Sequence, residues 1–232
     1  MEEHKKFGAT DFLMLLAVLV WAVNFSIIKI ALREFSPQGF NGIRLFFASS
    51  VLVLVLSLTK EGLSIPRSLF WKIILIGIVG NTIYQLLFIH GLNWSTASNT
   101  SVIMAMTPVF IAMLSNFLKH ERIHWAGWLG IFISFIGFYF VITRQASIFH
   151  FSWETVRGDL MIFMGNICWS FYTVLSKPLL DKISPLKLTS LTMATGTLFY
   201  LPFAAREVVR LHWNEVSFKA WAGLLFSGLF SL

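Results

Sequence analysis

Uncharged stretches recur along the chain at about the length of a membrane-spanning helix. An α-helix needs about 20 mostly apolar residues to cross about 30 Å of hydrocarbon. Five stretches lack Asp, Glu, Lys, Arg and His and approach or reach that length: 12–28, 73–89, 97–118, 125–143 and 160–176. Extended to their polar flanks, and joined by three less regular apolar stretches, they predict eight helices: about 12–32, 38–58, 70–90, 97–118, 125–143, 159–179, 186–204 and 218–232.

The ends of these segments carry helix signals of their own. Ser36-Pro37 and Ser184-Pro185 stand at predicted helix starts, where proline is tolerated best. The last segment stops at Leu232 without a charged flank. At about 15 residues it would span only about 22 Å, so we expect the final helix to be incomplete.

Composition supports a membrane protein over a soluble one. The chain is 56% hydrophobic and 12% charged, with a mean hydropathy of +0.75, whereas soluble proteins keep about a quarter of their residues charged. The net charge of +7 lies largely in the connections, where it suits lipid headgroups, so the lipid bilayer is expected as a partner and nucleic acid is not. The single cysteine, Cys168, lies in an apolar run and allows no internal disulfide; no metal and no cofactor are expected.

Basic residues predict the orientation of the helices. With a cytoplasmic N-terminus, ten of the eighteen Lys and Arg residues fall in inside loops and six in outside loops. The remaining two, Lys29 and Arg44, lie within helices. We therefore expect a multi-pass protein of the inner or plasma membrane with its N-terminus in the cytoplasm.

The chain also contains a faint internal repeat. Residues 11–50, shifted by 148 positions onto 159–198, align without a gap, and the matching residues are Asp11 with Asp159, Trp21 with Trp169, Lys29 with Lys177, and Ser36-Pro37 with Ser184-Pro185. Coincidence among similar helices is the alternative. Because five helices separate the two copies, the second copy would enter the membrane from the opposite side, which is typical of secondary transporters with a solute site near the membrane middle.

Several of these residues resemble one known family. Trp21-Ala-Val-Asn24-Phe-Ser-Ile-Ile-Lys29, followed by Ser36-Pro37 and Arg44, is similar to the opening of EamA-type transporters of the drug/metabolite transporter superfamily. The stretch from Thr96-Ala-Ser to Thr107-Pro108-Val109-Phe110 agrees, as do Glu121 and Trp125-x-Gly127-x-x-Gly130.

The resemblance implies ten helices in two five-helix halves, with both termini in the cytoplasm. On that pattern residues 1–144 form the first repeat, 145–158 a connecting loop, and 159–232 a second repeat that lacks its last two helices. The expected fold is therefore an all-α membrane helix bundle with an inverted repeat, its second half truncated and about eight helices present.

Polar and aromatic residues within the helices are candidates for a solute site. Asn81 and Gln85 share one helix face, with Tyr84 beside them. Further candidates recur at matching spacing in the first and sixth helices, and one charge lies in the second: Trp21, Asn24, Asn166, Trp169, Tyr172 and Arg44. A guanidinium suits two-pronged binding of a carboxylate or phosphate. Hydrogen bonds between helices are the alternative for each of these residues, and reaching back to the membrane interface is the alternative for Lys29.

A competing motif points to a different class of protein. His120-Glu121-x-x-His124 fits the zinc-protease signature, in which both histidines must lie on one helical face. The segment falls between two apolar runs, so we expect a connecting turn that would break this geometry.

The predicted function is transport, with no enzymatic activity. We expect a secondary transporter that exports a small organic metabolite, such as an amino acid, by alternating access. An intramembrane zinc protease and a truncated protein without transport activity remain the alternatives, and assembly into a homo-oligomer stays open.

Overall fold

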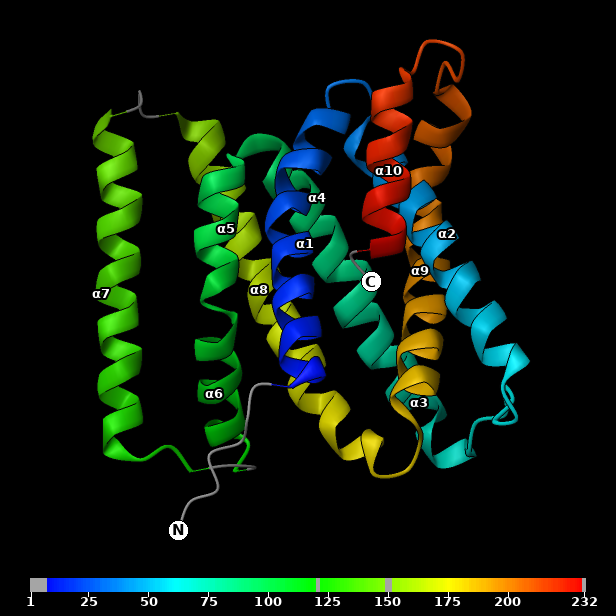
Figure 1. Cartoon of the computed structure of the whole chain (residues 1–232), viewed down its shortest axis with the longest axis horizontal. Helices are drawn as coiled ribbons and strands as arrows, with labels where there is room; N and C mark the ends of the chain where they lie inside the picture. The colour runs from blue at the N-terminus through cyan, green and yellow to red at the C-terminus, as the bar shows by residue number, and fades with distance from the viewer. Residues whose placement is uncertain (1–7, 120–121, 149–151, 231–232) are drawn as a thin grey trace.

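The structure is a computed structural model of the 232-residue chain and describes residues 8–119, 122–148 and 152–230. Within these residues the chain forms helices and connecting loops, in the order α1 (Ala9–Ala31), α2 (Pro37–Leu58), α3 (Arg67–Gly77), η1 (Ile78–Ile83), α4 (Tyr84–Trp94), α5 (Ala97–Ala105), α6 (Thr107–Phe117), α7 (Trp125–Ile148), α8 (Trp153–Leu180), α9 (Pro185–Arg210) and α10 (Phe218–Phe230). Helices α3, η1 and α4 continue one another, and α5 and α6 form one broken rod. The described chain therefore contains the eight predicted segments (Figure 1).

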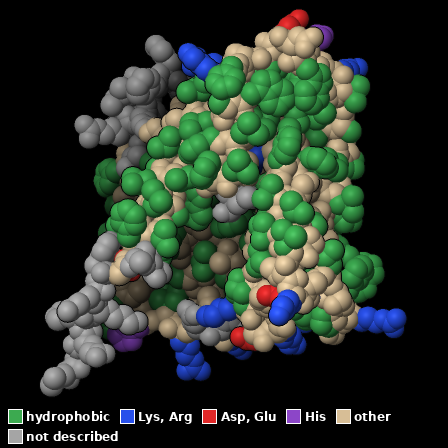
Figure 2. Space-filling view, turned by 45° about the vertical axis from the view of Figure 1, so that its right-hand side comes forward, with side chains coloured by type: hydrophobic (Ala, Val, Ile, Leu, Met, Phe, Trp, Pro, Cys, Tyr) green, Lys and Arg blue, Asp and Glu red, His purple; other side chains and the backbone are tan. Residues whose placement is uncertain are grey.

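Long apolar helices confirm the membrane character of the fold. Among the described residues, four spans are long and apolar enough to cross a membrane: Asp11–Ala31, Pro37–Leu58, Arg67–Trp94 and Ala97–Phe117. Hydrophobic side chains cover the middle of the molecular surface, and most charged side chains lie toward its two ends (Figure 2). This distribution is typical of a membrane protein whose middle section contacts lipid and whose two ends contact water.

Two of the long rods contain a local irregularity. The π-helical turn η1 separates α3 from α4 without ending the helix, and it contains Gly80, Asn81 and Thr82. The rod from Ala97 to Phe117 breaks at Met106, between α5 and α6. Pro108 follows in the first turn of α6, and its missing N–H contributes to this break. π turns occur often at functional sites.

Helices of the two proposed repeats run in opposite directions. In Figure 1, α1 rises toward the top whereas α8 descends, and α2 descends whereas α9 rises. Ser36 and Ser184, the paired serines of the repeat, both accept a backbone N–H as the N-cap of their helix: Gly39 N at 3.3 Å and Lys187 N at 3.2 Å. The corresponding helices are therefore antiparallel, as an inverted repeat requires.

Small residues allow α9 to pack closely against α2 and η1. Helices α2 and α9 lie against each other along their length, and a Cβ added to Gly42 would collide with the side chain of Ala204. Similarly, a Cβ on Gly196 of α9 would collide with Cβ of Asn81 in η1. Close backbone approach of this kind is the usual way in which membrane helices gain packing energy.

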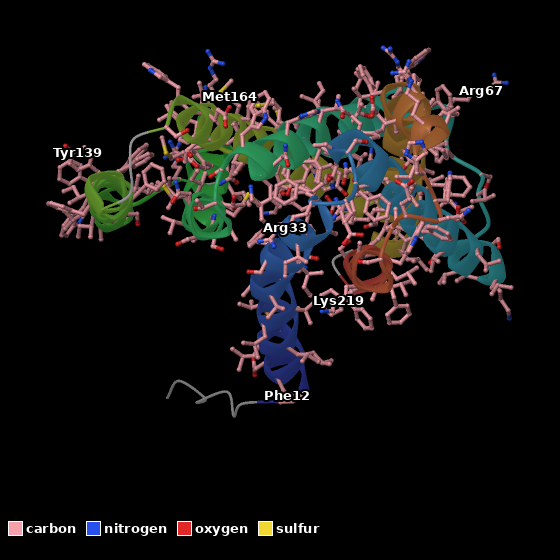
Figure 3. The ribbon with its side chains drawn as sticks, turned by 90° about the horizontal axis from the view of Figure 1, so that it is seen from above. Phe12, Arg33, Arg67, Tyr139, Met164 and Lys219 are labelled. Atoms are coloured by element: carbon pink, nitrogen blue, oxygen red, sulfur yellow. The ribbon has the colours of Figure 1, made fainter. Side chains whose placement is uncertain are left out.

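Helix α1 leaves the bundle toward its N-terminal end. Figure 3 shows the Phe12 end of α1 well away from the other helices, whereas its Arg33 end joins them. The outlying part carries large exposed side chains such as Phe12 and Leu13, both 61% exposed. Ile28 and Ala31, near the other end of α1, are buried, so α1 is anchored through its C-terminal half.

Candidate solute-binding site

A buried guanidinium joins helices α2 and α4 in the interior. Arg44 is only 5% exposed. Its Nε and Nη2 donate to Oδ1 of Asn41 at 3.0 and 2.6 Å, and Nη2 also donates to Oε1 of Gln85 at 2.7 Å. Helix α10 reaches the same place, since a Cβ on Gly228 would lie 3.6 Å from Arg44 Cγ. The structure thus brings the predicted residues Arg44 and Gln85 into direct contact.

An aromatic cluster continues from this point across α4 and α8. The rings of Tyr84 and Trp169 have centroids 5.1 Å apart, and Trp169 stacks on Tyr172 at 4.9 Å with an interplanar angle of 29°. Phe88, 5.6 Å from Tyr84, and Phe25, 6.0 Å from Phe88, extend the cluster to α1. Three predicted site residues from two helices therefore form one aromatic surface beside Gln85.

Helix α9 contributes Thr192 and Tyr200 to the surroundings of Arg44 and the aromatic cluster. The hydroxyls of Tyr172 and Thr192 lie 3.3 Å apart, and Tyr200 is fully buried within electrostatic range of Arg44. Under the repeat shift of 148 positions, Tyr172 corresponds to Asn24 and Thr192 to Arg44. Both members of this contact therefore lie at positions that the repeat shift pairs with predicted site residues.

Two predicted asparagines carry buried polar atoms that lack a partner among the described residues. They are Oδ1 of Asn24 and Nδ2 of Asn81, in side chains that are 5% and 7% exposed. Asn24 precedes Phe25, a member of the aromatic cluster, and Asn81 lies in η1 one residue before Thr82, which donates to Gly196 O at 2.8 Å. A buried amide group without a partner is costly, and a bound solute is one way to satisfy it.

Two other predicted residues lie in different surroundings. Trp21 is 50% exposed on α1. Asn166 is fully buried, and its amide is already engaged at the break between α5 and α6: Nδ2 donates to Ile103 O at 2.8 Å, and Oδ1 accepts from Thr107 Oγ1 at 2.7 Å. In this arrangement Asn166 stabilises the broken rod through both ends of its amide.

Lys29 has a structural explanation. Its Nζ donates to the carbonyl oxygens of Leu92, Asn93 and Ser95, at 2.8, 2.5 and 2.6 Å. These carbonyls belong to the end of α4, where helical carbonyls lose their internal partners and a cation is favourable. Lys29 therefore caps the end of α4.

Asp159 also binds the turn between α4 and α5, which contains Ser95. Its carboxylate accepts hydrogen bonds from Ser95 Oγ and from Asn99 Nδ2, the latter at 2.8 Å. Lys29 and Asp159, two of the residues that define the repeat, thus both bind the turn between α4 and α5.

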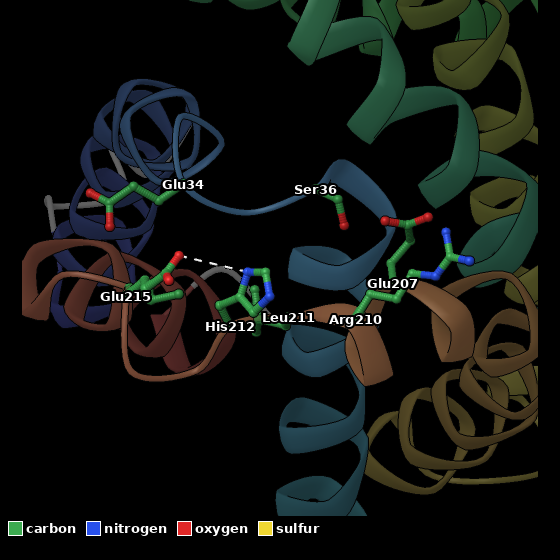
Figure 4. A pocket seen from close by; sticks show the side chains of 8 residues that line it. Glu34, Ser36, Glu207, Arg210, Leu211, His212 and Glu215 are labelled. Carbon is green, nitrogen blue, oxygen red and sulfur yellow. Dashed lines mark ion pairs between the residues drawn. The ribbon is translucent and has the colours of Figure 1, made fainter.

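A surface pocket of about 370 Å³ lies at the end of the molecule that carries the α1–α2 and α9–α10 loops. It is lined by Glu34, Ser36, Glu207, Arg210, Leu211, His212, Glu215 and Val216 (Figure 4). Glu34 accepts from Ser217, from its N–H at 2.6 Å and from its hydroxyl at 2.8 Å, and these hydrogen bonds lower the pKa of Glu34. The pocket contains none of the predicted site residues.

Several neighbours of the cluster were not predicted. Asn41 precedes Arg44 by three residues on one helix, so helical spacing alone could have suggested it. Thr192, Tyr200 and the π turn carry no comparable signal, because their role depends on which helices become neighbours.

The zinc-protease motif falls partly outside the described residues, since His120 and Glu121 are not described. Residues 122–124 have no helical structure, and α7 begins only at Trp125. His124 therefore does not share a continuous helix with residues 122 and 123, and the rest of the motif lies outside the described residues.

Comparison with known proteins identifies a family. The model of the EamA-like transporter family matches residues 8–143 and 156–232. An uncharacterized transporter, YyaM of Bacillus subtilis, is 29% identical over 95% of this chain and 73% of its own length. An uncharacterized transporter of Archaeoglobus fulgidus is 32% identical over 84% of this chain and 66% of its own length.

A more distant relative has a more specific name. A protein of Chlamydia trachomatis named S-adenosylmethionine/S-adenosylhomocysteine transporter is 23% identical over 88% of this chain and 63% of its own length. One crystal structure superposes with a TM-score of 0.62 at 19% identity, over 92% of this chain and 73% of the other. This last similarity concerns the fold. The chain spans about two thirds to three quarters of the length of these proteins.

Proposed function

The chain belongs to the EamA-like transporter family, and from this premise we propose that it moves a small metabolite of the amino-acid class across the cell membrane by alternating access. We further propose export from the cytoplasm, a cytoplasmic N-terminus, and two inverted repeats at 1–144 and 159–232. The observation that carries the solute class is the buried Arg44 beside Gln85 and the aromatic cluster.

Each part of an amino acid has a matching group among the buried residues of the helices. The guanidinium of Arg44 suits a carboxylate. Oδ1 of Asn24, a buried acceptor without a donor among the described residues, suits the ammonium group. The surface formed by Tyr84, Trp169 and Tyr172 suits an apolar or planar side chain.

The name of one relative agrees with this solute class. Both molecules in the name of the Chlamydia trachomatis transporter carry an α-amino acid group. A solute bound between the repeats would become accessible from either side as the repeats rock against each other.

Uptake by proteoliposomes tests the proposal. The full chain is reconstituted with unlabelled amino acids inside, and entry of labelled tryptophan or methionine is compared with entry of the matched amines that lack the carboxylate. We expect exchange of the amino acids above protein-free liposomes and little exchange of the amines. Equal entry of acid and amine would contradict a carboxylate site at Arg44.

A double variant identifies the residues. Asn24→Ala with Gln85→Ala should abolish exchange, whereas Ser134→Ala, which removes an exposed hydroxyl on α7 bonded to Gly130 O of its own helix, should leave it intact. Unchanged exchange in the double variant would remove these two residues from the site.

A further inference from the structure

The guanidinium of Arg44 fixes the orientation of two amide side chains. Asn41 Oδ1 accepts from its Nε and Nη2 at 3.0 and 2.6 Å, and Gln85 Oε1 accepts from its Nη2 at 2.7 Å. A guanidinium can only donate hydrogen bonds, so the oxygen of each amide faces it and each NH2 group points elsewhere. Asn41 and Gln85 therefore act as hydrogen-bond donors toward the rest of the interior.

Nδ2 of Asn41 lies near a second buried donor, the hydroxyl of Tyr200 on α9. The two side chains are close enough to interact, yet neither Nδ2 of Asn41 nor the Tyr200 hydroxyl forms a hydrogen bond among the described residues. Both side chains are 0% exposed, so bulk water does not reach them. Buried polar groups without a partner are costly and rare, so an acceptor that both donors share is expected at this point.

The packing of Tyr200 explains why its hydroxyl depends on the groups of α2. Its ring belongs to a buried apolar cluster with Leu45, Ala48, Met193 and Ala204. Gly42, the residue after Asn41, allows the ring to approach α2, since a Cβ on Gly42 would lie 3.8 Å from Cε1 of Tyr200 and would collide with Ala204. The apolar cluster holds the ring and leaves the hydroxyl beside Asn41, within electrostatic range of Arg44.

We propose that Asn41, Arg44 and Tyr200 form a buried site for a small monoanion between α2 and α9, with chloride or the carboxylate group of a solute as the ligand. Nδ2 of Asn41 and the Tyr200 hydroxyl donate to the anion, and the charge of Arg44 stabilises it electrostatically. A monoanion accepts several hydrogen bonds and donates none, so it fits a set of donors. A water molecule fits less well, because its own two hydrogens also require acceptors. The site goes beyond the proposed function, because binding of an anion requires no transport.

Thermal melting of the full chain in detergent tests the site without a solute. Sodium chloride is compared with the sodium salt of a bulky sulfonate buffer at equal ionic strength, since that anion is too large for an enclosed site. We expect chloride to raise Tm relative to the sulfonate, because a ligand that binds the folded protein stabilises it by mass action. Equal Tm values in the two salts, as expected for a bound water molecule, would overturn the proposal.

Tyr200→Phe removes one donor and keeps the ring in its apolar cluster. We expect the apparent Kd for chloride, obtained from Tm against chloride concentration, to rise about tenfold, as for the loss of one hydrogen bond to a charged group. The control is Tyr139→Phe, which removes the hydroxyl of a tyrosine that is 63% exposed on α7 and should leave Kd unchanged. Broadening of the chloride NMR line gives Kd a second time, without melting the protein. An unchanged Kd in Tyr200→Phe, or the same change in both variants, would refute the site.

Competition separates the two sources of the anion. Tryptophan should raise the apparent Kd for chloride, whereas tryptamine, which lacks the carboxylate, should not. Chloride binding without competition by tryptophan would support an inorganic anion site and contradict a solute carboxylate at Arg44. Conversely, amino-acid exchange by a protein whose Tm does not respond to chloride would support the proposed transport function and refute this anion site.

Discussion

Nη2 of Arg44 lies 2.7 Å from Oε1 of Gln85 and so connects α2 to α4 inside the first repeat. Both side chains were candidates from sequence, on different helices and for different reasons. The hydrogen bond makes them one unit, so changes at either residue should affect solute binding together.

Arg44→Lys tests the geometry of this unit. An ammonium keeps the charge but loses the planar fork that contacts Asn41 and Gln85 together. We expect KM for amino-acid exchange to rise about tenfold, equivalent to about 1.4 kcal/mol, with a smaller change in maximal rate. Concentration-dependent exchange in proteoliposomes measures both. An unchanged KM would place the solute elsewhere.

Asn166→Leu separates structure from solute binding. Because the Asn166 amide holds Ile103 O and Thr107 Oγ1, its loss should destabilise the protein by about 1–3 kcal/mol. Thermal melting in detergent should show the loss, whereas KM of the remaining folded protein should stay the same. A higher KM without a lower Tm would return Asn166 to the solute site.

Lys29→Met should destabilise the end of α4. The substitution leaves the carbonyls of Leu92, Asn93 and Ser95 without their common donor, at a cost of about 1–3 kcal/mol. Lys182→Met, which changes an exposed lysine in the α8–α9 loop, is the control and should melt like the parent protein. Equal Tm values for both variants would contradict the capping role.

Glycine substitutions probe the contact between the repeats. Gly196→Ala forces a Cβ against Asn81 Cβ, and overpacking of this kind costs about 1–3 kcal/mol. At Gly130 of α7 a new Cβ meets nothing within 4 Å, so Gly130→Ala should not lower Tm. If both variants melted alike, the close approach of η1 and α9 would be in doubt.

The loop contact at Glu34 should depend on pH. The hydrogen bonds from Ser217 lower the pKa of Glu34 below its ordinary value of about 4.3. Their contribution is therefore present above that value and is lost as pH falls through the lowered pKa. Hydrogen exchange of the first turn of α10, corrected for intrinsic rates, should accelerate at pH 3 relative to pH 7. Glu34→Gln should remove most of this difference.

The positions of the helices could be predicted because charged residues mark their ends. The segments predicted at 38–58 and 97–118 correspond closely to Pro37–Leu58 and Ala97–Phe117. Ser36 and Ser184 could be recognised as caps because serine followed by proline has a local meaning.

The contacts between helices required the fold. Lys29 and Asp159 are conspicuous in the sequence, yet nothing in their spacing indicates that both converge on the turn at Ser95. Asn166 was grouped with Trp169 because they share a helical face. In the fold, however, the amide of Asn166 forms hydrogen bonds with Ile103 O and Thr107 Oγ1 at the break between α5 and α6. Neighbouring helices, not spacing, decide whether a polar side chain faces a solute or a backbone carbonyl.

The π turn at Ile78–Ile83 has a consequence for the register of its whole rod. A π turn holds about one residue more than an α-helical turn, so the helix after it is rotated relative to a regular helix by roughly 100°. Deleting one residue within 78–83 would restore a regular helix while leaving Tyr84 and Gln85 in their present directions relative to α3. A family member that lacks one residue at this point would therefore have a regular α-helix here and would present the same face of α4 to the interior. A one-residue gap in an alignment at 78–83 would then mark a π turn replaced by an α-helical turn.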